Sequence, residues 1–264
     1  MTIFIMNIFQ SIVLGIVEGI SEFLPISSTF HLIWTSRFLS LTQNDFTKLF
    51  EVFIQGGAVL AVIFLYFKEV MRDRALFVKL LLSFIPTALV GFLMYKIIKG
   101  VFFESTQTIT IVFILVGAVF LVVEYLIQKN WLKLEKNITK LSYRQAILIG
   151  VVQSLSVLPG VSRAGAVILG MMFFRFKRSE AAKYSFMLSV PTILAASLYD
   201  FYKMREVIFV SNDKLVVLLV GFVVAFASAY VGVKWLIKFL QTHSLLSFGW
   251  YRIILGIILL LLLI

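Results

Sequence analysis

The sequence contains no cysteine and only two histidines, and both shortages exclude kinds of site. Without cysteine the chain forms neither a disulfide nor a thiolate metal site. Two histidines are too few for a histidine-rich metal centre. A metal ion bound by this chain would therefore be held mainly by oxygen ligands, which suit hard cations.

Charged residues are also scarce, at 14% of 264 residues, whereas 61% of the residues are hydrophobic. A soluble domain is normally about half apolar and about one quarter charged. Because hydrocarbon does not solvate charged side chains, this balance indicates an integral membrane protein.

The net charge of +11 does not indicate nucleic acid binding. Most Lys and Arg residues stand in short segments between apolar runs, a pattern that controls topology in a membrane. No large basic patch on a soluble surface is indicated, so we expect no nucleic acid partner. The first apolar run lacks a basic start and carries Glu18 and Glu22, so we expect no cleaved signal peptide.

Six apolar runs are long enough to cross about 30 Å of hydrocarbon at about 1.5 Å per residue. They lie at about 50–67, 80–96, 109–127, 184–201, 215–235 and 249–264. Two further stretches, 8–39 and 144–174, are apolar but interrupted by polar residues, glycine and proline. Such interruptions are typical of re-entrant helix–loop–helix hairpins that line a polar cavity. The sequence therefore predicts a single all-α membrane domain, 1–264, with six transmembrane helices and two re-entrant hairpins.

The two interrupted stretches resemble each other at an offset of 135 residues. The matching pairs are Gln10 and Gln145, Ile12 and Ile147, Gly15 and Gly150, Val17 and Val152, Ser21 and Ser156, and Ser27 and Ser162. The next runs match at an offset of 134, with Leu60 and Leu194, Ala61 and Ala195, and Phe67 and Phe201.

A repeat that holds one hairpin and three crossings has an odd number of crossings, so the second copy is inserted upside down. The pattern thus predicts an inverted-topology repeat, with repeat 1 at about 8–128 and repeat 2 at about 143–264. The two hairpin tips should then meet at a site near the membrane midplane.

Most of the 24 Lys and Arg residues fall on one side of this arrangement. That side holds the segments 68–79, 128–144, 175–183 and 234–252, and Arg252 is counted with the last of them. The excess of positive charge makes this side cytoplasmic. Both termini and the first hairpin then face outward, and the site opens toward the periplasm.

Glu18 and Glu22 are four residues apart, so they share one face of a helix. Two carboxylates inside a membrane repel each other, and they persist only with a cation, a proton or a basic side chain between them. An oxygen-only pair suits Mg²⁺ or Ca²⁺, especially an ion that also binds phosphate oxygens. The structural alternative is an acid pair held by Arg or Lys.

A hydroxyl run, Ser27, Ser28 and Thr29, follows Pro25 directly and precedes His31. Proline ends one helix and the hydroxyl groups can cap the next, whose free N–H groups form an anion site. His31 can act as a general acid or, less readily, as a nucleophile. Simple capping by the serines and a hydrogen-bonded core histidine are the structural alternatives.

The second hairpin carries Pro159-Gly160-Val161-Ser162-Arg163-Ala164-Gly165 at its turn. Its two glycines allow the backbone to approach a ligand closely, and Ser162 can cap the returning helix. Arg163 has a planar guanidinium group that matches phosphate oxygens. Structural pairing of Arg163 with Glu18 or Glu22 is the alternative, and a substrate that displaces this pair would unite the two interpretations.

Together these groups suit phosphoryl transfer, in which positioning and charge neutralisation dominate catalysis. Either Ser27 or a water would attack the terminal phosphorus, and Glu22 or His31 would move the protons. No Walker-type Gly-Lys-Ser loop is present, so a nucleotide is not implied.

Two motifs resemble the undecaprenyl-pyrophosphate phosphatase family, whose members are also called bacitracin-resistance proteins. The first is Glu-Gly-Ile-Ser-Glu-Phe-Leu-Pro-Ile-Ser-Ser-Thr-Phe-His at 18–31, and the second is Pro-Gly-Val-Ser-Arg-Ala-Gly at 159–165. Phe50-Glu51-Val52, Gln55-Gly56-Gly57, Tyr184-Ser185-Phe186 and Pro191 resemble the family as well, so the likeness covers essentially the whole chain.

The resemblance implies a bacterial plasma-membrane enzyme that removes one phosphate from undecaprenyl pyrophosphate. This reaction recycles the lipid carrier for peptidoglycan synthesis and confers bacitracin resistance. By the same resemblance, Glu18 and Glu22 bind a divalent cation, Mg²⁺ or Ca²⁺, and Glu22, Ser27, His31 and Arg163 are catalytic. Ser28, Gly160, Ser162 and Arg163 are expected to bind the lipid pyrophosphate.

Two positions depart from the family pattern, which has Ser and Thr where this chain has Ala164 and Val167. Those hydroxyl contacts to phosphate are then absent or supplied by Ser162. The residues alone also leave open a lipid-phosphate flippase or ion-coupled transporter, since inverted repeats with broken helices are a transporter plan. A non-catalytic scaffold is a third alternative, and a homodimer is compatible with the sequence.

Overall fold

The computed structural model describes residues 6–42, 44–97, 106–203 and 212–262, and no β-strand occurs among them. The predicted all-α class is therefore confirmed. The helices are α1 (Ile8–Ser21), α2 (Ser28–Phe38), α3 (Asp45–Arg72), α4 (Arg74–Ile97), α5 (Thr106–Gln128), α6 (Tyr143–Ser154), α7 (Arg163–Phe173), α8 (Arg178–Lys203), α10 (Asn212–Thr242) and α11 (Leu246–Leu261). Two single 3-10 turns, η2 (Ile138–Lys140) and η3 (Leu155–Val157), lie in the connections.

Five helices, α3, α4, α5, α8 and α10, are long and apolar enough to cross a membrane. They contain the first five predicted spans. The sixth predicted span, 249–264, overlaps α11, which begins three residues earlier, ends at Leu261 and, with 16 residues, is shorter than those five helices. Positions 263 and 264 lie outside the described residues. The structure thus supports a multi-pass membrane protein.

The outward-facing side chains agree with contact to lipid. Large apolar side chains on the long helices are strongly exposed, such as Phe64 at 71%, Phe92 at 77% and Leu93 at 74%. Charged side chains, in contrast, are buried inside, including Glu18, Glu124 and Arg252 at 0%. An apolar exterior around a charged interior is the reverse of the distribution in a soluble protein.

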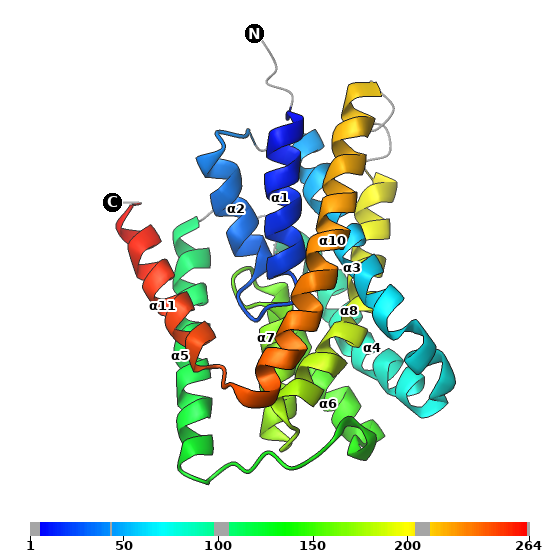
Figure 1. The fold of residues 1–264 in the computed structure, drawn as a ribbon, viewed down its shortest axis with the longest axis vertical. Coiled ribbons are helices and arrows are strands. Elements are labelled where there is room, and N and C mark those ends of the chain that lie inside the picture. The colour runs from blue at the N-terminus through cyan, green and yellow to red at the C-terminus, as the bar shows by residue number, and fades with distance from the viewer. Residues whose placement is uncertain (1–5, 43, 98–105, 204–211, 263–264) are drawn as a thin grey trace.

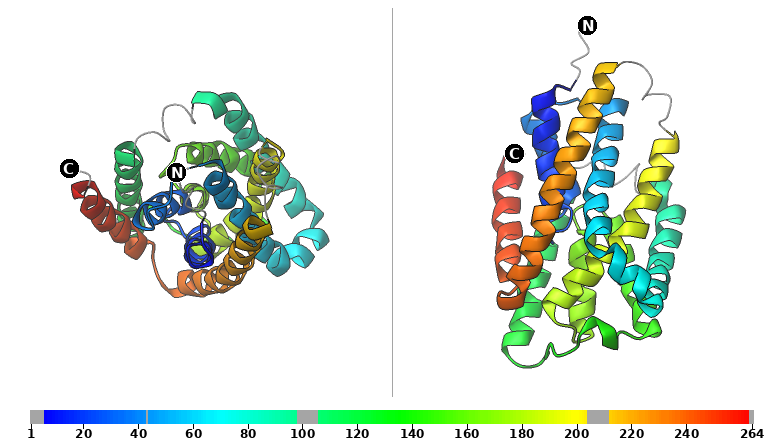
Figure 2. Two further views of the ribbon diagram at one scale, coloured as in Figure 1. Left: turned by 90° about the horizontal axis from the view of Figure 1, so that it is seen from above. Right: turned by 45° about the vertical axis from the view of Figure 1, so that its right-hand side comes forward.

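Two helix–loop–helix hairpins, α1–α2 and α6–α7, lie in opposite halves of the molecule (Figure 1). Their turns, residues 22–27 and 155–162, approach each other near the middle of the molecule. Seen from above, α2 lies toward the centre, with α4, α5, α10 and α11 around the outside (Figure 2). The fold therefore brings the two polar turns together and surrounds them with apolar helices.

Each hairpin packs against the other half of the chain. The first helix of hairpin one, α1, packs mainly on α10, and the first helix of hairpin two, α6, packs mainly on α4. The pairs α3 with α8 and α5 with α11 also join the two halves. The halves are thus interlocked and do not form two separate bodies.

Equivalent glycines allow the close approach of both hairpins. A Cβ atom at Gly15 would lie 2.8 Å from the carbonyl oxygen of Gly221 in α10. A Cβ atom at Gly150 would collide with the carbonyl oxygen of Ser83 in α4. The sequence match between Gly15 and Gly150 therefore reflects one packing requirement that occurs twice.

The helix ends of the two hairpins also correspond. Asn7 with Gln10 and Ser142 with Gln145 form capping boxes at the starts of α1 and α6, and each pair lies 135 residues from the other. The second helices, α2 and α7, follow Ser27 and Ser162, whose φ angles of 67° and 75° are both left-handed. Such a backbone is costly for residues other than glycine, so its occurrence at both turns is a specific common feature.

We expect alanine at Gly150 to destabilise the fold, because the added Cβ has no space between α6 and α4. Forced overpacking of this kind costs about 1–3 kcal/mol. Gly91 in α4 is the matched control, since a Cβ there has no neighbour within 4 Å. Gly91→Ala should raise stability by about 0.5–1 kcal/mol, the helix penalty of glycine. Thermal unfolding of the detergent-purified variants measures both effects, and equal midpoints would contradict the packing argument.

Candidate functional site

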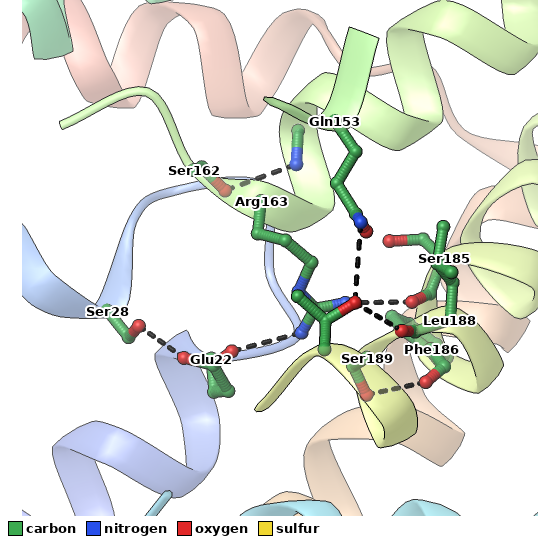
Figure 3. A network of polar contacts seen from close by, with 11 residues as sticks. Glu22, Ser28, Gln153, Ser162, Arg163, Ser185, Phe186, Leu188 and Ser189 are labelled. Carbon is green, nitrogen blue, oxygen red and sulfur yellow. Dashed lines mark hydrogen bonds and ion pairs between the residues drawn. The ribbon is translucent and has the colours of Figure 1, made fainter. Parts of the chain in front are cut away.

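An ion pair joins the turns of the two hairpins. Glu22 ends α1 and Arg163 begins α7, and the Arg163 Nη2 to Glu22 Oε1 distance is 3.0 Å. The second terminal nitrogen, Nη1, donates to the carbonyl oxygen of Ser185 in α8 at 2.7 Å (Figure 3). Only about a tenth of either charged side chain is exposed. Removing one partner of such a buried pair typically costs about 3–5 kcal/mol, so the pair fixes the turns relative to each other.

A polar cavity of about 120 Å³ lies between these turns. Its lining combines both hairpins with one residue of α3, and consists of Glu22, Ser27, Ser28, Thr29, Gln55, Ser156, Leu158, Pro159, Gly160, Ser162 and Arg163. Ser28 donates a hydrogen bond to the second carboxylate oxygen of Glu22 (Figure 3). The cavity therefore presents a guanidinium, a carboxylate and several hydroxyl groups to one small volume.

Glu18 lies in α1, one helical turn before Glu22, and is outside the cavity lining. Its side chain is fully buried, and neither of its carboxylate oxygens has a hydrogen-bond partner among the described residues. The charges that act on it are those of Glu22, Glu51 and Arg163. Two acids together with buried, unpartnered oxygens form an arrangement that a bound cation would stabilise.

No group of three or more His, Cys, Asp or Glu residues with metal-binding geometry occurs in the described part of the chain. A cation at Glu18 and Glu22 would therefore need other oxygen ligands. This is common for Mg²⁺, which often binds one or two carboxylates together with substrate phosphates.

Ser27 and Ser162 occupy equivalent positions but have different hydrogen bonds. The Ser162 hydroxyl accepts from the N–H of Gly165 at 3.1 Å and so caps α7. Ser27 precedes α2 in the same way, yet its side chain makes no capping bond. Both serines line the cavity, but only Ser27 has a hydroxyl that is not used for capping.

Gly160 at the second turn has a φ angle of 95°, which favours glycine. A Cβ atom there would lie 2.6 Å from the carbonyl oxygen of Ile109 in α5. Glycine at this position therefore lets the turn lie directly on α5 while its backbone lines the cavity.

The structure places His31 one turn into α2 and outside the cavity lining. Its Nδ1 atom lies 2.8 Å from the carbonyl oxygen of Ser27, and its Nε2 atom lies 2.7 Å from the hydroxyl of Tyr251. Its ring also stacks on Tyr251, with centroids 5.8 Å apart. This geometry connects His31 to the backbone of Ser27 and to α11.

The second hairpin lacks an acid pair. Gln153 stands 135 residues after Glu18, and its amide nitrogen donates to the Thr87 hydroxyl at 2.7 Å. The Thr87 hydroxyl in turn donates to the carbonyl oxygen of Gly150 at 3.0 Å. The equivalent position thus carries a neutral amide in hairpin two and a carboxylate in hairpin one.

Gln55, Ser185 and Arg252 are among the residues at or next to the cavity that were not predicted as site residues from the sequence. Gln55 and Ser185 were noted only for their resemblance to the family. Arg252 was placed in a cytoplasmic segment, and this was wrong: it lies within α11, its side chain is 0% exposed, and it contacts both hairpin turns. An arginine a few residues into an apolar run is itself a signal of an intramembrane function.

The fold and the cavity define a multi-pass helical membrane protein with a polar cavity between two hairpin turns. Residues 11–258 match the family described as bacitracin resistance protein BacA, and the chain belongs to this family. It is 48% identical to the undecaprenyl-diphosphatase of Sulfurihydrogenibium sp. over 96% of this chain and 98% of the relative. It is 46% identical to that of Persephonella marina over 97% and 99%, and 42% identical to that of Aquifex aeolicus over 96% and 97%.

We expect the two equivalent serines to differ in their effect on stability. Ser162→Ala removes a capping bond and should lower the free energy of unfolding by about 1 kcal/mol. Ser27→Ala removes no capping bond and should leave it nearly unchanged, although both positions have the same left-handed backbone. Thermal or denaturant unfolding of the two variants in one detergent tests this. A larger loss at Ser27 than at Ser162 would show that the capping assignment is wrong.

Proposed function

We propose that this chain is an undecaprenyl-diphosphatase, which hydrolyses undecaprenyl pyrophosphate to undecaprenyl phosphate and phosphate. This activity recycles the lipid carrier for peptidoglycan synthesis and confers bacitracin resistance. The observation that carries the proposal is the cavity in which Arg163 from one hairpin meets Glu22 from the other. The three relatives described above are undecaprenyl-diphosphatases, which supports the same activity.

The proposed membrane arrangement is six spans, α3, α4, α5, α8, α10 and α11, with α1–α2 and α6–α7 as re-entrant hairpins of an inverted repeat. The matching glycines, capping boxes and left-handed serines support the repeat. The segments 68–79 and 128–144, which are rich in Lys and Arg, then face the cytoplasm of a bacterial inner membrane, and the cavity opens toward the periplasm.

Glu18 and Glu22 are the residues that would hold a divalent cation, Mg²⁺ or Ca²⁺. The unpartnered oxygens of Glu18 support this assignment. Such a cation, when bound, would neutralise negative charge on the phosphates. Gln55 lines the same cavity and offers a neutral oxygen nearby.

The proposed reaction begins when a substrate phosphate takes the place of Glu22 at Arg163. The guanidinium then neutralises phosphate charge, and Glu22 is freed to accept a proton. The Ser27 hydroxyl attacks the terminal phosphorus, its proton passes to Glu22, and the anhydride bond to the lipid phosphate breaks. Water then hydrolyses the phosphoserine and restores Ser27. His31 supports Ser27 through its carbonyl oxygen and acts by positioning.

A transporter on the same scaffold would use Arg163 and the two acids to bind a lipid phosphate without cleaving it. The comparisons do not favour this alternative, because the relatives are named for diphosphatase activity. An assay without a membrane gradient separates the two functions directly.

We expect the detergent-purified protein to release phosphate from a prenyl pyrophosphate, to lose this activity with a chelator, and to regain it with Mg²⁺ or Ca²⁺. Arg163→Ala should lower turnover by about 100- to 1,000-fold, as is typical when one group that stabilises a developing anion is removed. Glu18→Gln should lower turnover strongly and raise the cation concentration needed for activity.

Ser27→Ala should abolish turnover, because it removes the hydroxyl group that attacks the phosphorus.

Lys183→Met is the matched control for Arg163→Ala. It also removes a cation from an ion pair, Lys183 with Glu69 at 2.6 Å, but this pair does not line the cavity. Its turnover should equal that of the unchanged protein. Normal turnover in folded Arg163→Ala or Glu18→Gln protein would refute the proposed site, and substrate transport without phosphate release would favour the transporter.

We expect single cysteines to report the proposed orientation, since the chain has none of its own. Lys48→Cys at the start of α3 should react with an impermeant maleimide once the outer membrane is permeabilised. Lys133→Cys, in the segment after α5, should react only after the inner membrane is also opened. Both lysines are exposed, so access to the reagent differs only through topology. The opposite labelling pattern would invert the assignment.

A further inference from the structure

Arg252 is a fully buried arginine that the reaction proposed above does not use. It lies in α11, two residues after Trp250, with a side chain that is 0% exposed. None of the ion pairs found among the described residues includes it. A buried guanidinium without a carboxylate is unusual, because arginine stays charged and loses its hydration. Its other contacts must therefore stabilise it.

Those contacts are three backbone carbonyl oxygens from three segments. Arg252 Nε donates to Phe113 in α5 at 3.0 Å, Nη1 to Pro25 at 3.1 Å, and Nη2 to Gly160 at 2.6 Å. The guanidinium also lies over the ring of Phe113, 4.4 Å from its centroid. One planar group thus ties both hairpin turns to α5.

Pro25 and Gly160 are equivalent positions of the two turns, 135 residues apart, like Ser27 and Ser162. Arg252 therefore bonds the corresponding carbonyl of each turn. Two residues after Pro25 stands Ser27, and three residues after Gly160 stands Arg163. A displacement of either turn would move Ser27 relative to Arg163 across the cavity.

The neighbouring residue strengthens this connection. Tyr251 bonds His31 through its hydroxyl, and His31 contacts the carbonyl oxygen of Ser27. Two successive residues of α11 thus hold the first turn, one at Pro25 and one near Ser27.

We propose that Arg252 is a positioning residue whose guanidinium fixes the two turns relative to each other, so that Ser27 and Arg163 face the same phosphate. It acts through geometry, because three separate donors in one plane are needed to span the three carbonyls. Its effect on turnover rests on the proposed phosphatase function, whereas its effect on the turns does not.

The test compares Arg252→Lys and Arg252→Met with the matched control Arg178→Met. Arg178 is a largely buried arginine, with 21% of its side chain exposed, but it bonds Glu124 and is bonded to neither turn. We expect both Arg252 variants to lower kcat by about 100-fold, the usual effect of misplacing reacting groups by about 1 Å. KM should change little, because Arg163 is still present to bind the phosphate. Arg178→Met should lower the unfolding temperature but leave kcat per folded protein unchanged.

Hydrogen exchange of the two turns, 22–27 and 155–162, and of the first residues of α2 and α7 provides a measurement that does not depend on activity. Both turns should exchange faster in the Arg252 variants and remain unchanged in Arg178→Met. Unchanged exchange in Arg252→Lys and Arg252→Met would overturn the proposal, as would full kcat in Arg252→Lys, which keeps the charge but loses the planar group. If Arg252→Met does not fold, Arg252→Lys carries both measurements. Should the unchanged protein release no phosphate, the phosphatase function fails while the exchange measurement still decides the function of Arg252.

Discussion

Polar groups enclosed by apolar helices must find their partners within the protein, and the Glu22–Arg163 pair meets this constraint across two hairpins. The buried carboxylate of Glu22 and the buried guanidinium of Arg163 each stabilise the charge of the other. The two turns therefore have to lie next to each other. The long helices have to surround them and leave space for them at the centre. Arg252 meets the same constraint differently, with carbonyl oxygens of both turns and of α5 as its acceptors.

The fold repeats, but the chemical groups do not. Both hairpins begin with a capping box, pack through a glycine and turn at a left-handed serine. Glu18 nevertheless corresponds to Gln153, and the capping hydroxyl of Ser162 corresponds to the uncommitted hydroxyl of Ser27. The two hairpins thus share a similar frame, while a few differing side chains place the carboxylates in hairpin one and Arg163 in hairpin two.

Patterns of whole segments predicted the all-helical class and the positions of the long helices. Apolar runs gave five of the long helices, and broken runs at 8–39 and 144–174 gave both hairpins and the meeting of Glu22 with Arg163. The positions and contacts of single side chains were harder to predict. Arg252 was misplaced because counting loop charges assumes that cations lie outside the apolar region. The difference between Ser27 and Ser162 depends on one hydrogen bond, and the contact of His31 with Tyr251 joins residues 220 positions apart. No local pattern reports either feature.

Because α1 packs mainly on α10 and α6 packs mainly on α4, the two hairpins find their main neighbours at different times during synthesis. Ribosomes make a chain from its amino end, so α1 emerges first while its main neighbour α10 is among the last helices to be translated. The hairpin with Glu18 and Glu22 must wait, incompletely enclosed, until most of the protein has been inserted. The second hairpin faces no such delay, because α4 precedes α6. The amino-terminal hairpin is therefore the part of the fold whose packing is completed last.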